Sequence, residues 1–273
     1  MKSEKNNGKH SEPMKLFSAE KLTLYFGGLL AVNQFSLSLD RGELVGLIGP
    51  NGAGKTTVFN MIAGFLKPTA GRIVFAGKEI TDLKPNAVTR RGIGRTFQNI
   101  RLFQDLKVLE NVMISHHGRL RSSFLGAVLR TPLYRQEEQE MVERSLRLLQ
   151  RVGLEKNAQE RAGGLSYGQQ RRLEIVRALA TQPKLLLLDE PAAGMNPQET
   201  RDLMQFIIQV KQEFGLTILL IEHDMEVVMG ICERIMVLDY GAVIAEGTPR
   251  EIQNNPRVVE AYLGEGEGGG RFA

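Results

Sequence analysis

Two kinds of hydrophobic pattern alternate along the chain. Runs of apolar residues, which predict buried strands, occupy residues 43–48, 72–77, 184–188, 217–221 and, as a pair around a turn, 234–247. Apolar positions three or four apart, which predict helices, occupy residues 55–65, 106–118, 136–153, 169–182 and 197–215. Apolar strands that alternate with helices are typical of a parallel sheet covered on both faces. The pattern therefore predicts an α/β fold.

Two segments depart from this alternation. Residues 21–40 are strand-like, and Phe35, Leu37 and Leu39 alternate with polar residues as in a half-buried strand. Residues 92–161 are mostly helical and predict a helical subdomain inserted into the sheet core. In the second predicted helix of this insert, the apolar positions near one stripe are Met141, Val142, Leu146, Leu149 and Val152.

The composition indicates a folded protein with a substantial core. Of the 273 residues, 42% are hydrophobic and 24% are charged, which excludes a chain that is disordered throughout. One domain is expected at residues 16–263, between a flexible polar tail at residues 1–15 and a flexible tail with five glycines at residues 264–273. Apolar runs are far shorter than the ~18–20 residues of a membrane span, and residues 1–13 lack the apolar stretch of a signal peptide.

Cysteine content and charge narrow the function further. The single cysteine, Cys232, cannot form an intrachain disulfide, which fits a reducing compartment. The net charge of +4 suits phosphorylated ligands, nucleic acid or an anionic membrane surface without selecting among them. Basic residues are scattered and are not interleaved with aromatic residues, so no nucleic-acid partner is expected.

A phosphate-binding loop follows the first short apolar strand. The segment GPNGAGKT matches the pattern G-x-x-x-x-G-K-[ST] in full, with a predicted strand before it and a predicted helix after it. Glycines let the backbone wrap closely around phosphate, and the helix start adds the positive end of its dipole. Lys55 is expected to neutralise the terminal phosphates and Thr56 to ligate Mg²⁺. The predicted nucleotide-binding residues are Gly49, Pro50, Asn51, Gly52, Ala53, Gly54, Lys55, Thr56 and Thr57.

Two carboxylates follow the run of four leucines at residues 185–188. Asp189 is expected to hold Mg²⁺, and Glu190, one residue further on, to polarise the attacking water as a general base. An Asp-Glu-Pro segment also occurs where a strand simply ends in a turn. Together with the phosphate-binding loop, however, the pair favours a nucleotide hydrolase.

A second helix start contains the residues of an anion site. The segment LSYGQ at residues 165–169 precedes a predicted helix. Ser166 fits a helix N-cap, and a Ser and a Gly at a helix N-terminus also suit an anion. Because Ser166 lies far along the chain from Lys55, it need not face a nucleotide bound in its own chain.

In this order, the motifs resemble those of the ATP-binding subunits of ABC transporters. LSYGQ is similar to the family signature LSGGQ and lies just upstream of the acidic pair. By this resemblance, Gln98 in RTFQ contacts Mg²⁺ and the lytic water and adjoins the membrane partner, and His223 in IEHD contacts the γ-phosphate. Phe26 takes the place of the aromatic residue that stacks on adenine, with Tyr25 as the neighbouring alternative.

The resemblance implies a fold, a reaction and two ligands. The fold is that of a P-loop NTPase of the ABC type, with a mostly parallel sheet, an antiparallel β part and the helical insert. The ligands are ATP and Mg²⁺, and the reaction is ATP hydrolysis. The catalytic residues are expected to be Glu190, His223 and Gln98, the metal ligands Thr56, Gln98 and Asp189, and the further nucleotide contacts Phe26, Ser166, Gly168 and Gln169.

Two such subunits are expected to close head to tail. ATP in the glycine-rich loop of one chain is then held by Ser166 and Gly168 of the other, which adds hydrogen-bond donors around the γ-phosphate. Hydrolysis reopens the pair, and membrane permeases convert the motion into alternating access.

The sequence departs from the wider family pattern at two places. Tyr167 replaces the first glycine of the signature, and Asn196 stands where many members have an aspartate, within the segment AAGMNP. Asn196 also suits a helix N-cap, since Pro197 and Glu199 follow it at the positions typical of a helix start. These departures bear on contacts between subunits rather than on ATP binding.

Longer stretches resemble one branch of the family, the LivG-type ATPases of bacterial branched-chain amino acid (Leu/Ile/Val) uptake. They include FGGLLAVN, RTFQNIRLF, DEPAAGMNP, IEHDMEVVMGI and NNPRVVEAYLGE. This resemblance implies a second ATPase subunit, identical or different, two membrane permeases and, indirectly, a periplasmic amino acid-binding protein as partners. It places the chain peripherally on the cytoplasmic face of the inner membrane.

Other functions are compatible with the same ATPase motifs. An ATPase of lipopolysaccharide export, or of another ABC transporter, is close in sequence type, because cargo contacts lie on other chains. A DNA-repair ATPase of this kind carries a long coiled coil between the phosphate loop and the signature, and no sustained heptads occur here. A module that binds ATP without hydrolysing it is disfavoured because Glu190 and His223 are both present.

Overall fold

The computed structural model describes residues 15–116 and 131–263. Its strands are β1 (Lys15–Phe26), β2 (Leu29–Asp40), β3 (Leu44–Ile48), β4 (Ala70–Phe75), β5 (Lys78–Glu79), β6 (Ile93–Arg95), β7 (Leu185–Asp189), β8 (Thr217–Ile221), β9 (Arg234–Asp239) and β10 (Ala242–Gly247). Its α-helices are α1 (Lys55–Ile62), α2 (Pro85–Arg91), α3 (Val108–His116), α5 (Pro132–Arg151), α6 (Tyr167–Ala180), α7 (Pro197–Phe214), α8 (Met225–Ile231), α9 (Pro249–Gln253) and α10 (Pro256–Leu263). The tails expected at residues 1–15 and 264–273 lie outside the described residues, apart from Lys15, which begins β1.

The strands form two sheets. The larger has the order β10-β9-β3-β8-β7-β6, and its neighbours from β9 to β6 are parallel. β10 pairs with β9 in the antiparallel sense at one edge. The smaller sheet, β2-β1-β4-β5, is antiparallel throughout. The expected mostly parallel core with an antiparallel β part is therefore confirmed.

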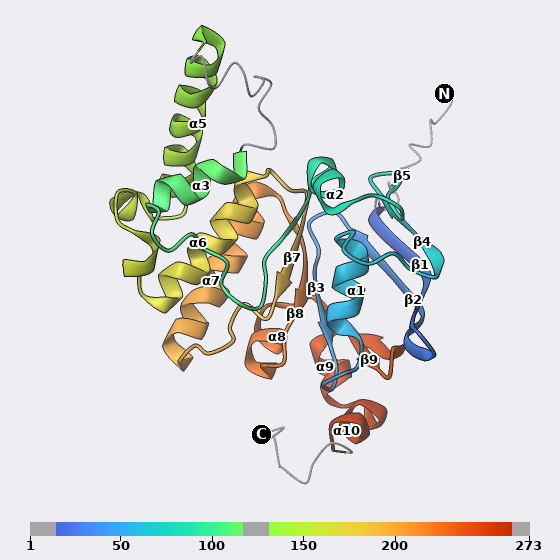
Figure 1. The fold of residues 1–273 in the computed structure, drawn as a ribbon. Coiled ribbons are helices and arrows are strands. Elements are labelled where there is room, and N and C mark those ends of the chain that lie inside the picture. The colour runs from blue at the N-terminus through green and yellow to red at the C-terminus, as the bar shows by residue number, and fades with distance from the viewer. Residues whose placement is uncertain (1–14, 117–130, 264–273) are drawn as a thin grey trace, which may run out of the picture.

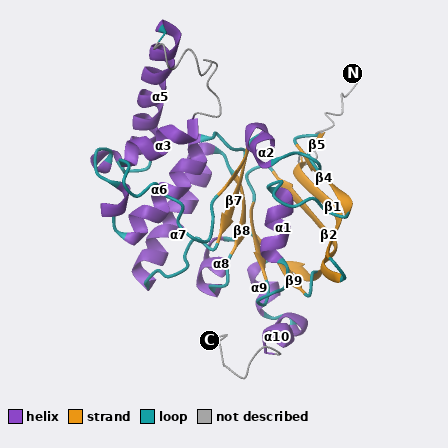
Figure 2. Cartoon of the chain, viewed as in Figure 1, coloured by secondary structure: helices purple, strands orange, loops and turns teal. Residues whose placement is uncertain are grey.

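Both faces of the parallel sheet are buried. Along β7, Leu186 and Leu188 face a core that includes α6, α7 and α8, whereas Leu185 and Leu187 face a second core with α1 and the antiparallel sheet. Figures 1 and 2 show this arrangement, with α6 and α7 on one side of the parallel strands and α1 and β1, β2 and β4 on the other. The two helices that begin at the candidate phosphate sites, α1 and α6, therefore lie on opposite faces of the sheet.

The helical insert shares the core on the α6 side. Val112 of α3 and Leu149 of α5 belong to the same cluster as Leu173 and Val176 of α6. The sheet also contains Ile93–Arg95 as its edge strand β6, paired with β7, so the helical part starts later than the expected boundary near residue 92. A strand of three residues is too short to show a period in the sequence, and only its pairing reveals it.

The strand-like stretch at residues 21–40 is two strands rather than one. β1 and β2 form an antiparallel hairpin whose turn contains Gly27 at φ +58° and Gly28. The predicted alternation holds within β2, where Phe35, Leu37 and Leu39 are buried.

One residue of the apolar stripe predicted on α5 is not buried. Leu146 is 39% exposed, whereas Ser145 and Leu148 are buried. The buried face of α5 runs through Met141, Ser145, Leu148 and Leu149, so the apolar residue at position 146 lies off it. Across the described ranges, no helix is both long and apolar enough to pass through a membrane.

Candidate active site

The glycine-rich loop joins β3 to α1 and encloses the Lys55 side chain. Lys55 is 8% exposed, and its Nζ donates to the carbonyl oxygens of Gly49 at 2.6 Å and Pro50 at 2.8 Å. Gly49 cannot carry a side chain, since a Cβ there would lie 1.9 Å from the carbonyl oxygen of Leu238. Gly54 caps α1 at φ +102°. The ammonium group is therefore held inside the loop at a helix N-terminus, which attracts phosphate.

The three predicted catalytic side chains converge at the carboxyl ends of parallel strands. Gln98 follows β6, Glu190 follows β7 and His223 follows β8. Gln98 Nε2 donates to Glu190 Oε2 at 2.8 Å, and His223 Nδ1 lies 3.5 Å from the same oxygen. The glycine-rich loop follows β3, the neighbour of β8. This edge is where open parallel sheets bind their ligands.

Glu190 has an unusual backbone conformation. Its φ is +44°, a left-handed value that residues with a side chain rarely adopt. Its N–H donates to the carbonyl oxygen of Ile221 at 2.9 Å, which anchors the residue to the end of β8. Strained residues of this kind cluster at functional sites, where the surrounding structure imposes their conformation. The carboxylate of this residue contacts both Gln98 and His223.

Asp189, the predicted metal ligand, is paired with a buried arginine. Arg95 Nη2 lies 2.9 Å from Asp189 Oδ2, and the two side chains are 8% and 5% exposed. Arg95 also donates to Asn60 Oδ1 at 2.7 Å. The guanidinium lies 5.2 to 5.8 Å from the centroids of three rings, those of Phe59, Phe65 and Phe97. Arg95 was not predicted as a site residue from the sequence, where it is one basic residue in the short segment GIGRTF before Gln98.

The predicted metal ligands suit a magnesium ion that arrives with phosphates. Thr56, Gln98 and Asp189 supply hydroxyl, amide and carboxylate oxygens, which hard cations prefer. Within the described part of the chain, no group of three or more His, Cys, Asp or Glu side chains could hold a metal ion. Mg²⁺ typically keeps several waters and is bound by one or two protein oxygens together with substrate phosphates. The residues present therefore fit Mg²⁺ bound together with a nucleotide.

Glu222 supports the loops after β7 and β8. It is 1% exposed, and its carboxylate accepts hydrogen bonds from the backbone N–H of Ala192 at 2.8 Å and of His223 at 3.2 Å. Burial raises the pKa of Glu222 above its ordinary value. Glu222 was not predicted as a site residue from the sequence, although it directly precedes His223.

The predicted adenine contact lies on the β1–β2 hairpin, whose second strand passes beside the phosphate loop. Phe26 and its alternative Tyr25, at the end of β1, are each 48% exposed. The following strand, β2, approaches the loop closely, since the carbonyl oxygen of Ala31 would lie 2.8 Å from a Cβ on Gly54. An exposed aromatic ring at this place has the surface that a purine base needs for stacking.

Ser166, Gly168 and Gln169 lie at the start of α6, across the sheet from α1. Ser166 is the N-cap, and it forms a capping box with Gln169, which confirms the structural interpretation of this segment. Asn196 caps α7 in the same way with Glu199. Tyr167 contacts the segment AAGMNP that contains the other departure, because its hydroxyl donates to the carbonyl oxygen of Ala193 at 2.8 Å.

The chain is similar to proteins of one family over most of its length. Residues 32–193 match the family described as ABC transporter, and residues 242–268 match the branched-chain amino acid ATP-binding cassette transporter family. The chain is 49% identical over 250 residues to the high-affinity branched-chain amino acid transport ATP-binding protein LivG of Salmonella typhimurium, covering 92% of this chain and 98% of that one. The corresponding protein BraF of Pseudomonas aeruginosa is also 49% identical, over 89% of this chain and 96% of its own.

Solved structures agree with these matches. The crystal structure of the ADP conformation of an ATP-binding cassette of an ABC transporter has a TM-score of 0.81 and 36% identity, covering 92% of this chain and 100% of that one. A nucleotide-free ATP-binding cassette from an ABC transporter also has a TM-score of 0.81, at 37% identity and with the same coverage.

Proposed function

The chain belongs to the ABC transporter family of ATP-binding proteins, and we propose that it is the ATP-hydrolysing subunit of an importer for branched-chain amino acids. The hydrolytic part of this proposal rests on one observation, the convergence of Gln98 and His223 on the Glu190 carboxylate beside the Lys55 loop. The cargo rests on the match of residues 242–268 and on the names of the relatives.

Each group of residues in the site has its own proposed role in the reaction. The backbone of residues 49–57 and the Lys55 ammonium group bind the phosphates of ATP, and Phe26 stacks on the base. Glu190 accepts a proton from the attacking water, while Gln98 and His223 orient that water and the γ-phosphate. Thr56, Asp189 and Gln98 would hold Mg²⁺, which supplies charge neutralisation on the phosphates.

A second ATPase subunit completes the site. α6 and α1 pack on opposite faces of the sheet, so Ser166 and Gly168 suit a nucleotide bound by a partner. The Ser166→Arg variant is then expected to lose ATPase activity while its own nucleotide affinity, measured by calorimetry, stays unchanged. Loss of nucleotide binding would mean that Ser166 serves its own chain's site.

The membrane permease is proposed to dock beside Gln98. A groove of about 410 Å³ opens there, and its lining includes apolar side chains such as Phe65, Phe97 and Phe103 together with Arg95, Arg101, Arg177 and Glu174. A groove that combines apolar and charged side chains suits a short amphipathic segment of a partner. With the permease docked there, the chain is proposed to lie peripherally on the cytoplasmic face of the inner membrane.

Reconstitution of the native complex tests the proposal as a whole. The tagged full-length chain is purified from its host with its permeases, and the complex is placed in liposomes that contain the periplasmic binding protein. Leucine, isoleucine or valine is expected to stimulate ATP hydrolysis and to be taken up. Stimulation by lipopolysaccharide instead, or permeases of an exporter in the purified complex, would replace the proposed cargo with the alternative one.

A further inference from the structure

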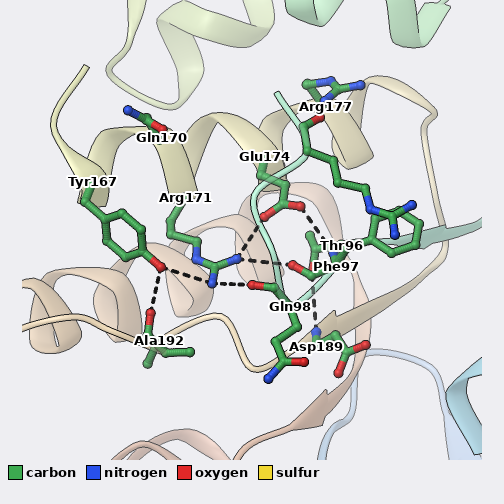
Figure 3. A network of polar contacts seen from close by, with 12 residues as sticks. Thr96, Phe97, Gln98, Tyr167, Gln170, Arg171, Glu174, Arg177, Asp189 and Ala192 are labelled. Atoms are coloured by element: carbon green, nitrogen blue, oxygen red, sulfur yellow. Dashed lines mark hydrogen bonds and ion pairs between the residues drawn. The ribbon is translucent and has the colours of Figure 1, made fainter. Parts of the chain in front are cut away.

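One side of α6 contacts two of the three loops that carry the proposed catalytic residues, those after β6 and β7. Tyr167, Arg171 and Glu174 are spaced four and three residues apart, which places them on the same face of the helix. Figure 3 shows Arg171 and Glu174 directed from α6 towards the segment that contains Phe97 and Gln98, and Tyr167 directed towards Arg171 and the segment at Ala192. This segment is the loop after β6, here called the Gln98 loop (residues 96–98).

Arg171 and Glu174 form hydrogen bonds with the backbone of the Gln98 loop. Arg171 Nη1 donates to the carbonyl oxygen of Phe97 at 3.1 Å, and its Nη2 donates to that of Gln98 at 2.6 Å. The N–H of Phe97 donates to Glu174 Oε1 at 3.2 Å. Backbone donor and acceptor groups of two successive residues, Phe97 and Gln98, are thus bound by one pair of side chains, which ties the loop to α6.

The Arg171–Glu174 pair is itself buried. Its N···O distance is 3.1 Å, and the side chains are 3% and 6% exposed. Burial raises the pKa of Glu174 and is opposed by the hydrogen bond from Phe97 and the charge of Arg171. The desolvation cost of such a pair offsets much of its attraction, so its effect lies more in fixed geometry than in net stability.

Tyr167 extends the same network to the loop after Glu190. Its hydroxyl accepts a hydrogen bond from Arg171 Nη2 at 3.3 Å and donates to the carbonyl oxygen of Ala193 at 2.8 Å. Gly194 packs beside it, since a Cβ there would lie 3.4 Å from the Tyr167 oxygen. A glycine at position 167, as in the common signature, has no atom that could make either hydrogen bond.

We propose that Tyr167, Arg171 and Glu174 are positioning residues that link the nucleotide bound in the chain's own loop to the Ser166 helix start. Two paths make this link, one through the Gln98 loop and one through the loop after Glu190. The Gln98 side chain bonds to Glu190 at 2.8 Å while its carbonyl oxygen bonds to Arg171 at 2.6 Å, and Ala193, three residues after Glu190, bonds to Tyr167. A γ-phosphate that displaces Gln98 or Glu190 therefore moves the first turn of α6. This inference rests on the proposed function, because it assumes ATP at residues 49–57.

Hydrogen exchange of the full chain tests the link directly. Amide exchange is measured by mass spectrometry with and without Mg²⁺ and the ATP analogue that has an imido bridge between its β- and γ-phosphates. The variants are Tyr167→Phe, which removes one hydroxyl, and Arg171→Lys, which keeps the charge but loses the planar fork. Arg172→Lys is the matched control, since Arg172 lies next on α6 but donates to the carbonyl oxygen of Asp202 and faces the Phe206 ring.

The expected result separates the variants from the control. In the wild type and in Arg172→Lys, the analogue slows exchange both at residues 49–57 and at residues 166–170. In Tyr167→Phe and Arg171→Lys, protection at residues 49–57 persists, whereas the response at residues 166–170 is lost. Without nucleotide, Tyr167→Phe is also expected to exchange about fivefold faster at residues 97–98, which corresponds to the loss of one hydrogen bond. The effect reaches the Gln98 loop through Arg171, which bonds to both Tyr167 and that loop.

Two results would overturn the inference. If residues 166–170 respond equally in all four proteins, the three side chains are merely structural; melting curves show whether they affect stability alone. If the analogue does not protect residues 49–57 even in the wild type, the proposed function fails, and the inference fails with it.

Discussion

The Nε2 atom of Gln98 donates to the Glu190 carboxylate at 2.8 Å, although the two residues are 92 positions apart. The bond joins the loops that follow two adjacent parallel strands, β6 and β7. It holds the proposed general base beside the side chain that would orient the attacking water. The same carboxylate oxygen lies 3.5 Å from His223 Nδ1 on the next strand's loop. Three strand ends therefore direct their side chains to one point.

Replacing the general base is expected to separate binding from turnover. Glu190→Gln keeps an oxygen that can accept from Gln98 but loses the basic carboxylate. ATP hydrolysis by the assembled complex should fall by about 100-fold or more, while ATP affinity stays unchanged. Phosphate release and calorimetry measure the two quantities, and Glu143→Gln, on the exposed face of α5, serves as the control. Normal turnover in Glu190→Gln would remove Glu190 from its assigned role.

The Lys55 ammonium group is expected to dominate phosphate binding. Lys55→Ala removes a buried charge that is already directed into the loop by two carbonyl oxygens. Charge-assisted hydrogen bonds of this kind correspond to about a 10- to 100-fold loss of ATP affinity. Lys67→Ala, which removes an exposed lysine paired with Asp82, should leave the affinity unchanged in the same titration. Equal affinities for the two variants would contradict the assignment.

If Phe26 stacks on the adenine base, its removal should weaken the binding of ligands that contain a base and leave the binding of other ligands unchanged. Phe26→Ala should weaken ATP binding about tenfold, because base–aromatic stacking is lost. Binding of inorganic triphosphate, which has no base, should not change. Leu29→Ala is the control, since Leu29 pairs with Phe26 across the hairpin and is 69% exposed. If Tyr25→Ala shows the loss and Phe26→Ala does not, the adjacent tyrosine is the stacking residue.

Removing one partner of the buried Arg95–Asp189 pair is expected to cause a large loss of stability. Arg95→Ala leaves the Asp189 carboxylate buried without its counter-ion, which typically lowers the free energy of unfolding by about 3–5 kcal/mol. Arg147→Ala, which breaks an exposed pair with Glu143, should have a far smaller effect in the same urea titration. Adding Asp189→Asn to Arg95→Ala should restore part of the loss, and no restoration would show that the two charges are not coupled.

Glu222 predicts a particular dependence of stability on pH. Burial raises its pKa in the folded chain, so the native state binds more protons than the unfolded state between the ordinary and the raised pKa. The contribution of Glu222 to the free energy of unfolding therefore falls as pH rises through this interval. Glu222→Gln should remove that part of the fall, as measured by urea denaturation at a series of pH values.

Glu251 provides a control of opposite sign. Hydrogen bonds from Thr248 lower its pKa, so its contribution is present above the ordinary glutamate range and is lost as pH falls through the lowered pKa. Glu251→Gln should change the acid limb of the curve instead. If the free energy of unfolding of Glu222→Gln depends on pH in the same way as that of the wild type, burial does not raise the pKa of Glu222.

Local sequence determined most of the elements and the identity of the candidate site. The leucine run of β7, the period of two in β2 and the caps of α6 and α7 each depend on neighbouring residues, and all were predicted. The phosphate loop was predictable for the same reason, because its glycines, its lysine and its flanking strand and helix are contiguous. The roles of Gln98, His223, Phe26 and Ser166 stay predictions.

Tertiary structure alone decided which of these residues touch. The edge strand β6, the Arg95–Asp189 pair, the Gln98–Glu190 bond and the contact of Tyr167 with Ala193 all join positions far apart in the chain. No local pattern encodes them, since they depend on the order of strands in the sheet and on which face of α6 turns inward. Tertiary structure also decided the direction in which two pKa values shift. Only a folded core can desolvate Glu174 and Glu222 and so raise their pKa values.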